Sequence, residues 1–162
     1  VLEKMTGEKI VGYRGPLDLL PNCALDLMKQ RKYLYCSTLK DCDWAYVHEK
    51  YPIVELPTEP ALDDLSYFYF SYADEATITC SYPVDYVYEF WKDNFDELAN
   101  ENDKIMVLKL HPQLIGRSSR IRMLEHCIAY MKANGAWITT CKNVAEYVKE
   151  FYVQKAEERG NL

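Results

Sequence analysis

Short apolar runs alternate with amphipathic stretches along this chain. In the amphipathic stretches, apolar residues recur at intervals of three and four, which is the spacing of one face of a helix. The predicted helices cover residues 24–31, 84–100, 120–133 and 144–156. The apolar face of the second helix is predicted to consist of Val84, Val87, Tyr88, Trp91 and Phe95. The buried stripe of the third helix is predicted to consist of Ile121, Leu124, Ile128 and Met131.

Compact apolar runs that end at proline, glycine or polar residues predict the strands. They cover residues 9–13, 32–36, 52–56, 104–110 and 136–139. Residues 40–50 are polar and predict a loop, whereas the aromatic stretch 62–72 fits a helix and a strand equally well. Because strands alternate with helices, we expect an α/β fold with a parallel sheet and crossover helices, in one domain over residues 1–162.

Charge and composition narrow the range of partners. The formal net charge is -6 and the pI is about 5.1, which argues against nucleic acid as a partner because nucleic-acid-binding domains present basic surfaces. Runs of about 18 apolar residues are absent from the sequence, so we expect no membrane-spanning segment. The 14 tyrosines predict half-buried surfaces, either at a subunit contact or in a carbohydrate-binding cleft.

The cysteines are dispersed and form no C-x-x-C pair. They are Cys23, Cys36, Cys42, Cys80, Cys127 and Cys141. Disulfide scaffolds are shorter and denser in cysteine, and zinc sites show closely paired cysteines. We therefore expect free thiols and a cytoplasmic location.

Two ionisable residues follow predicted strands, at the positions where active residues gather in parallel α/β folds. Arg14 follows the strand over residues 9–13, and His111 follows the strand over residues 104–110. Taken singly, each has a structural alternative, because a histidine in this position often serves only as a hydrogen-bonding group and an arginine as half of a salt bridge. His48 and His126 are expected to be structural or exposed.

Other catalytic patterns are weak or missing. Asp63 and Asp64 form a carboxylate pair that suits metal binding or acid–base chemistry, or else a solvated turn that caps a helix. The three histidines lack the i, i+2 or i, i+4 spacing of a metal pair, and the sequence contains no G-x-S-x-G motif.

The segment L-H-P-Q-L-I-G-R, from Leu110 to Arg117, continues into a predicted helix. This segment resembles the final motif of the polysaccharide deacetylase superfamily (carbohydrate esterase family four), in the branch of peptidoglycan-deacetylase-like proteins and cofactor-independent allantoinases. The segment G-Y-R-G-P, which contains Arg14 and Pro16, resembles the family's arginine–proline motif. Weaker likenesses at V-E-L-P, L-D-D and A-W-I-T-T extend the resemblance from about Val11 to Tyr152.

The resemblance implies the C-terminal portion of a distorted (β/α) barrel that hydrolyses C–N bonds. It implies that His111 is the general acid for the leaving amine and that Arg14 holds an aspartate base. Leu110 would line the site of the acyl group, and Pro16 and Trp44 are further candidates for substrate binding. An imidazole titrates near neutral pH, so it suits the acid role.

The resemblance also implies a divalent, zinc-like metal. The family binds it through T-F-D-D-G and H-x-x-x-H motifs, and neither motif occurs in these 162 residues. We therefore expect no metal ligands in this chain, and a C-terminal half that pairs with a missing N-terminal half or forms a homo-oligomer through its strand edges. The substrate stays open between N-acetylated sugars and a small cyclic amide or ureide. A non-catalytic binding or structural protein of the same fold is the alternative.

Overall fold

The structure is a computed structural model that describes residues 1–73, 76–79 and 81–158, with side chains described for 1–69 and 81–152. The chain divides into two compact units. Unit 1 comprises Val1–Pro57 with Thr139–Leu162, and unit 2 comprises Thr58–Ile138. The single domain predicted over residues 1–162 stays a prediction.

Unit 1 contains a four-stranded sheet. Its strands are β1 (Gly12–Tyr13), β2 (Tyr35–Cys36), β3 (Tyr46–Val47) and β4 (Val54–Glu55). They lie in the order β1-β2-β4-β3, where β1, β2 and β4 are parallel and β3 is antiparallel to β4. The first three predicted strands are confirmed in shorter form. The predicted loop over residues 40–50 was wrong in one respect, because it contains the edge strand β3.

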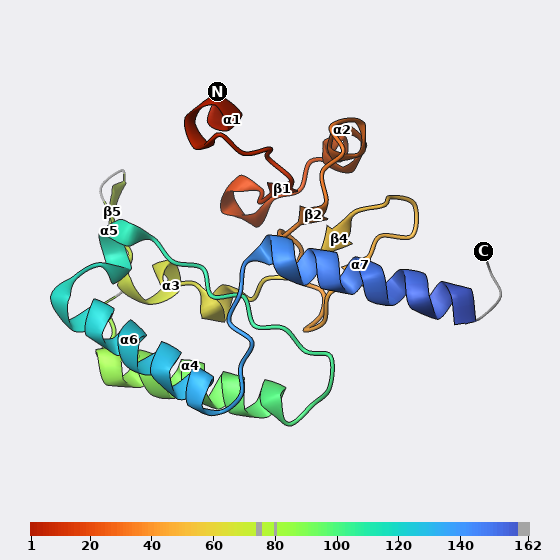
Figure 1. Ribbon diagram of the computed structural model, residues 1–162. Coiled ribbons are helices and arrows are strands. Elements are labelled where there is room, and N and C mark those ends of the chain that lie inside the picture. Colours follow the sequence, from red (N-terminus) through yellow and green to blue (C-terminus); the bar gives the residue numbers. More distant parts are fainter. Residues whose placement is uncertain (74–75, 80, 159–162) are drawn as a thin grey trace. The chain divides into compact units, whose positions relative to one another are not determined.

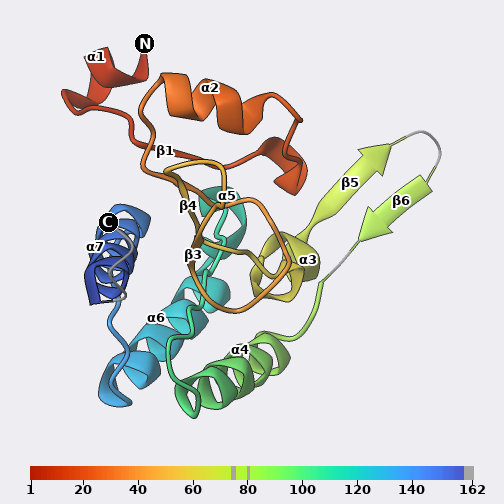
Figure 2. The same cartoon turned by 90° about the vertical axis from the view of Figure 1, so that its right-hand side faces the viewer.

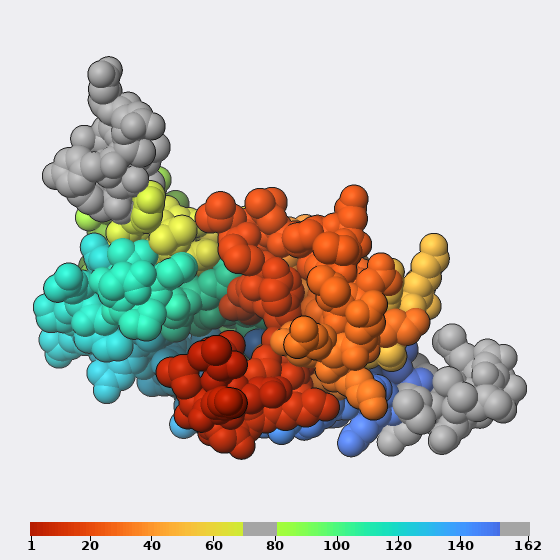
Figure 3. All heavy atoms as spheres, turned by 90° about the horizontal axis from the view of Figure 1, so that it is seen from above, coloured from red at the N-terminus to blue at the C-terminus, as the bar shows by residue number. Residues whose placement is uncertain are grey.

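Unit 1 also contains helices. They are α1 (Leu2–Thr6), the 3-10 helix η1 (Pro16–Asp18), α2 (Ala24–Gln30) and α7 (Cys141–Glu158). The long helix α7 packs against β2, β3 and β4 (Figure 1). Ala24 and Met28 of α2 are buried together with Cys36 and Ile53. In the space-filling view, the red N-terminal segment and the orange segment that includes α2 lie next to each other (Figure 3).

Unit 2 is mainly helical. Its elements are η2 (Pro60–Leu62), α3 (Leu65–Phe68), β5 (Phe70–Ala73), β6 (Ala76–Thr79), α4 (Val84–Ala99), α5 (Pro112–Ile115) and α6 (Ser118–Ala133). Helices α4 and α6 lie side by side (Figure 1), and β5 and β6 form an antiparallel ribbon (Figure 2). The aromatic stretch 62–72 therefore contains both a helix and a strand.

The core of unit 2 forms between α4 and α6. Val87, Trp91 and Phe95 of α4 are buried, as the sequence predicted. The stripe predicted for α6 was half wrong, because Ile121 and Ile128 are 47% and 38% exposed. The buried residues of α6 are Met123, Leu124, Cys127 and Met131. Both sets fit a helical period and share two members, so spacing alone could not separate them.

Two predicted strands do not form among the described residues. Residues 104–110 make a single parallel bridge, between Lys109 and Asp63, and residues 136–139 are irregular. A strand is defined by its hydrogen-bonded neighbours, and an apolar run predicts burial without supplying those neighbours. The sheet of unit 1 consequently does not close into a barrel within the described part of the chain.

Two further sequence predictions, the absence of a membrane-spanning segment and the presence of free thiols, concern location. Within the described residues, no helix combines the length and the apolar character needed to cross a membrane. The five cysteines whose side chains are described are free thiols, and Cys80 lies outside the described residues. The cytoplasmic location stays a prediction.

Candidate active site around His111

The candidate site of unit 2 forms where two extended segments meet. The backbone N–H of Lys109 donates to the carbonyl of Leu62 at 2.9 Å, and the N–H of Asp64 donates to the carbonyl of Lys109 at 3.1 Å. These two bonds make the parallel bridge between Asp63 and Lys109. The bridge places the Asp63–Asp64 pair beside the segment that continues into His111.

His111 occupies the turn between this segment and α5. Pro112 is the first residue of α5 and His111 is its N-cap, with φ -110° and ψ 114°. A proline disfavours helical backbone in the residue before it, so His111 stays extended while the helix begins immediately after it. The carbonyl of His111 accepts the N–H groups of Leu114 and Ile115 at 2.8 and 3.0 Å. Local sequence thus fixes the backbone that carries the imidazole.

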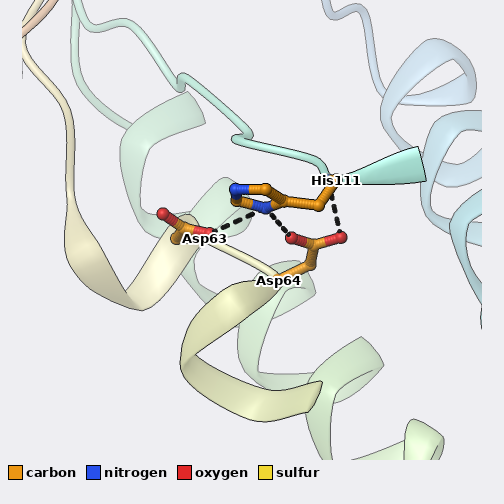
Figure 4. Close-up of side chains that lie close together, drawn as sticks. All are labelled: Asp63, Asp64 and His111. Carbon is orange, nitrogen blue, oxygen red and sulfur yellow. Dashed lines mark hydrogen bonds and ion pairs between the residues drawn. The ribbon is translucent and has the colours of Figure 1, made fainter. Parts of the chain in front are cut away.

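A fully buried carboxylate holds His111 at two points (Figure 4). Asp64 Oδ2 accepts the backbone N–H of His111 at 2.9 Å, and Asp64 Oδ1 lies 2.6 Å from His111 Nδ1. The side chain of Asp64 has no exposed surface, whereas that of His111 is 36% exposed. The imidazole is therefore anchored on one edge and open to solvent on another.

This geometry fixes which ring nitrogen faces Asp64. A carboxylate only accepts hydrogen bonds, so Nδ1 carries the proton that faces Asp64. No hydrogen bond joins Nε2 to any residue that the structure describes. Nε2 is consequently the ring nitrogen that does not face Asp64, on a side chain that is 36% exposed.

Asp63 has a different environment. Its Oδ2 lies 3.0 Å from Nζ of Lys109, whose side chain is buried, and its Oδ1 accepts the N–H of Leu65 at 2.9 Å. Oδ1 also lies 3.6 Å from His111 Nδ1. Asp63 is therefore held by the Lys109 ammonium and by the backbone N–H of Leu65 at the start of α3. This agrees with the capping part of the turn interpretation, but the turn is not solvated, because Asp64 is fully buried and the Asp63 side chain is only 14% exposed.

Asp63, Asp64 and His111 each offer a ligand atom within 4.8 Å of the others, so the group could hold a metal ion. The donor set does not fit the zinc-like metal that the resemblance implies. His111 Nδ1 is already hydrogen-bonded to Asp64 Oδ1, and the Lys109 ammonium pairs with Asp63 where a dication would compete with it. The cluster is better explained as a carboxylate–histidine pair beside a second carboxylate that is ion-paired with Lys109.

The other predicted site residues divide between the two units. Arg14 directly follows β1, and its Nε and Nη2 donate to the carbonyl and the hydroxyl of Ser37 at 3.0 and 2.7 Å. Pro16 begins η1, two residues further on. Trp44 is 49% exposed in unit 1, and Leu110, beside His111 in unit 2, is 37% exposed. Their roles in catalysis and substrate binding stay predictions.

Sequence reasoning missed the pairing of Asp64 with His111. The two residues are 47 positions apart, and the only signal was the adjacent Asp63–Asp64 pair, which fitted metal binding, acid–base chemistry and helix capping alike. A long-range contact of this kind depends on the bridge at Lys109, which a single sequence does not specify.

His111 lies where an extended segment passes into the helix α5, in the motif whose resemblance to polysaccharide-deacetylase-type hydrolases the sequence indicated. Solved structures confirm this resemblance. The chain is similar to a protein assigned as a polysaccharide deacetylase from Mycobacterium smegmatis, with 28% identity and a TM-score of 0.83 over 93% of this chain and 53% of that one. It is also similar to PuuE allantoinase, with 25% identity and a TM-score of 0.74 over 90% and 48% of the two chains.

A third similar structure, a protein assigned as a polysaccharide deacetylase from Pseudomonas aeruginosa PAO1, shares the fold at 22% identity, with a TM-score of 0.72 over 90% of this chain and 48% of that one. The chain thus spans about half the length of these solved structures. No protein-family model and no curated protein sequence matches it.

Proposed function

We propose that this chain supplies the general-acid portion of a metal-dependent hydrolase that cleaves C–N bonds other than peptide bonds. The observation that carries the proposal is the contact between Asp64 and His111 Nδ1 at 2.6 Å, which leaves Nε2 as the working nitrogen. The structural similarity to a deacetylase and to an allantoinase supports the reaction class.

In this reaction water adds to the carbonyl carbon of the substrate, and the C–N bond then breaks. The departing nitrogen is a poor leaving group until it receives a proton. His111 donates that proton from Nε2 while Asp64 holds the opposite edge of the ring. The divalent metal implied by the resemblance would be held by residues other than Asp63, Asp64 and His111. As the resemblance also implies, Arg14 would hold the carboxylate that acts as base.

The substrates that the proposal admits are N-acetylated sugars and small cyclic amides or ureides. Two of the similar structures are named for the first class and one for the second. The proposal therefore names the bond, a non-peptide C–N bond next to a carbonyl, and the substrate panel for the test contains both classes.

The test is turnover by the full-length protein on N-acetylated chito-oligosaccharides and on allantoin, with zinc supplied. His111→Ala is expected to lower kcat by about 10²–10⁴-fold, the range typical of general acid catalysis. His126→Ala, on an exposed position of α6, is the matched control and is expected to leave kcat unchanged.

Wild-type kcat in the His111→Ala variant would remove the acid role. A wild-type protein that binds members of the panel and hydrolyses none of them would instead favour the non-catalytic alternative.

A further inference from the structure

The loop that follows β2 is held by a buried carboxylate from β4. Glu55 has no exposed surface. Its Oε1 accepts the backbone N–H of Thr38 at 2.8 Å and that of Leu39 at 2.9 Å. Two successive N–H groups bound to one carboxylate oxygen fix the backbone of the loop more firmly than neutral acceptors would, because charge-assisted hydrogen bonds are stronger.

The second oxygen of Glu55 is also occupied. Oε2 lies 3.0 Å from Nε2 of His48, whose backbone N–H donates to the carbonyl of Ile53 at 3.0 Å. Burial raises the pKa of Glu55, but the hydrogen bonds from His48, Thr38 and Leu39 outweigh it, so the pKa lies below its ordinary value. The carboxylate is thus a satisfied, ionised group inside unit 1.

The same loop carries the partners of the arginine motif on its other side. Ser37 accepts both hydrogen bonds from the Arg14 guanidinium. The hydroxyl of Thr38 accepts the backbone N–H of Gly15 at 2.9 Å. Gly15 is buried, and a β-carbon there would collide with the carbonyl oxygen of Leu19, so this segment has little room to shift.

We propose that Glu55 is a positioning residue that sets the orientation of the Arg14 guanidinium through the Ser37–Thr38–Leu39 loop, with His48 holding the second oxygen of the carboxylate. The inference rests on the proposed function, in which Arg14 takes part in the chemistry. The pair of Glu55 and His48 touches no substrate in the proposed reaction. Its effect on that reaction is to orient the Arg14 guanidinium.

A purely structural role for Glu55 would predict something different. In that case, replacing it would lower stability while the environment of Arg14 stayed unchanged. The discriminating readout is therefore the Arg14 side chain itself, observed as its Nε–H signal by ¹⁵N NMR of the 162-residue chain. This measurement needs no substrate, so its outcome is distinct from that of the His111→Ala assay.

The main variant is Glu55→Gln, which keeps the shape and removes the charge. We expect amide hydrogen exchange at Thr38 and Leu39 to become at least about fivefold faster, because a neutral acceptor holds an N–H less strongly. The Nε–H signal of Arg14 is expected to shift and exchange faster in the same variant. Glu49→Gln, the same change at an exposed position of unit 1, is expected to leave all three signals unchanged.

A second pair of variants tests the other link. Thr38→Val removes the hydroxyl that accepts from Gly15, and Thr38→Ser retains it. We expect faster exchange at the Gly15 amide and a shifted Arg14 signal in Thr38→Val but not in Thr38→Ser, with the Leu39 amide still protected in both. These variants also serve if Glu55→Gln does not fold. A wild-type Arg14 signal in every folded variant among Glu55→Gln and Thr38→Val overturns the proposal.

Discussion

The two units each contain a carboxylate–histidine pair, and the second oxygen of the carboxylate binds different backbone in each pair. In unit 2, Asp64 contacts Nδ1 of His111 at 2.6 Å and also binds its backbone N–H. In unit 1, Glu55 contacts Nε2 of His48 at 3.0 Å, and its other oxygen accepts two backbone N–H groups of the loop that follows β2. Both carboxylates are fully buried.

The histidines differ in exposure. The side chain of His111 is 36% exposed, and that of His48 is 12% exposed. A carboxylate that is hydrogen-bonded to one nitrogen of an accessible imidazole leaves the other ring nitrogen for chemistry. A carboxylate paired with a nearly covered imidazole satisfies a buried charge and holds backbone in place. The surroundings of the pair, more than the residue types, therefore decide which histidine is the candidate catalyst.

The largest effect expected from this comparison concerns Asp64. Asp64→Asn should lower kcat of the full-length protein by about 10²–10⁴-fold, because an amide can donate to Nδ1 and so hold the ring in the wrong tautomer. The check is steady-state kinetics at constant substrate, with circular dichroism to confirm folding.

Asp63→Asn is the matched control for that measurement. Asp63 pairs with Lys109 and caps α3, so the variant should lose stability while retaining most of kcat. Equal losses of kcat in the two variants would show that Asp64 has no special relation to His111.

The second prediction compares the two cores. Trp91 is fully buried in unit 2, where its indole N–H donates to the carbonyl of Ala61 at 3.1 Å, and Met28 is buried in unit 1. Trp91→Ala should cost about 3–5 kcal/mol of unfolding free energy and Met28→Ala about 2–5 kcal/mol. If residues 1–162 form one domain, urea denaturation followed by tryptophan fluorescence and by circular dichroism shows one transition, and both variants lower its urea midpoint. Two transitions, each shifted by one variant only, would establish two domains.

The third prediction follows from the charge on Glu55. Its pKa is lowered in the fold, so the unfolded chain binds more protons as the pH falls below the ordinary value of 4.5. The stability that this group contributes is present above that pH and is lost as the pH falls through the lowered pKa. Glu55→Gln should be about 1–3 kcal/mol less stable than wild type at pH 7. Its free energy of unfolding should also fall less than that of wild type when the pH is lowered. Urea midpoints from pH 7 down to pH 3 measure this difference, and equal slopes in the two proteins would contradict it.

The sequence predicted the features that depend on neighbouring residues. The loop at His111 and Pro112, and the buried face of α4 around Trp91, were predicted because proline and helical periodicity act locally. Features that depend on distant partners were not predicted. The apolar run 104–110 indicated a strand, yet the described structure contains one bridge at Lys109, since pairing needs a neighbouring segment that the run does not encode.

The same limit applies to the candidate sites. Arg14 and His111 were identified from their motifs. Asp64 was named only as part of the Asp63–Asp64 pair and Glu55 only within the V-E-L-P likeness, and neither these residues nor Ser37 were linked to the side chains that they hold directly or through a loop. No role was predicted for Glu55 within its predicted strand, because the sequence does not distinguish a buried acid in a short strand from an exposed one until its partners are known. His48 was expected to be structural or exposed, and its side chain is largely covered by the fold.

The smallest expected effect concerns association. β1 and β3 are the edges of the four-stranded sheet, and exposed edges can pair with a second chain. Each edge strand is only two residues long, so it can form few hydrogen bonds with a second chain. The self-association predicted from the sequence should therefore be weak and concentration-dependent. Sedimentation velocity of the 162-residue chain over a hundredfold concentration range should show a shift from monomer towards dimer. A folded monomer at every concentration would contradict the prediction, and would show that two-residue edges are too short to recruit another copy.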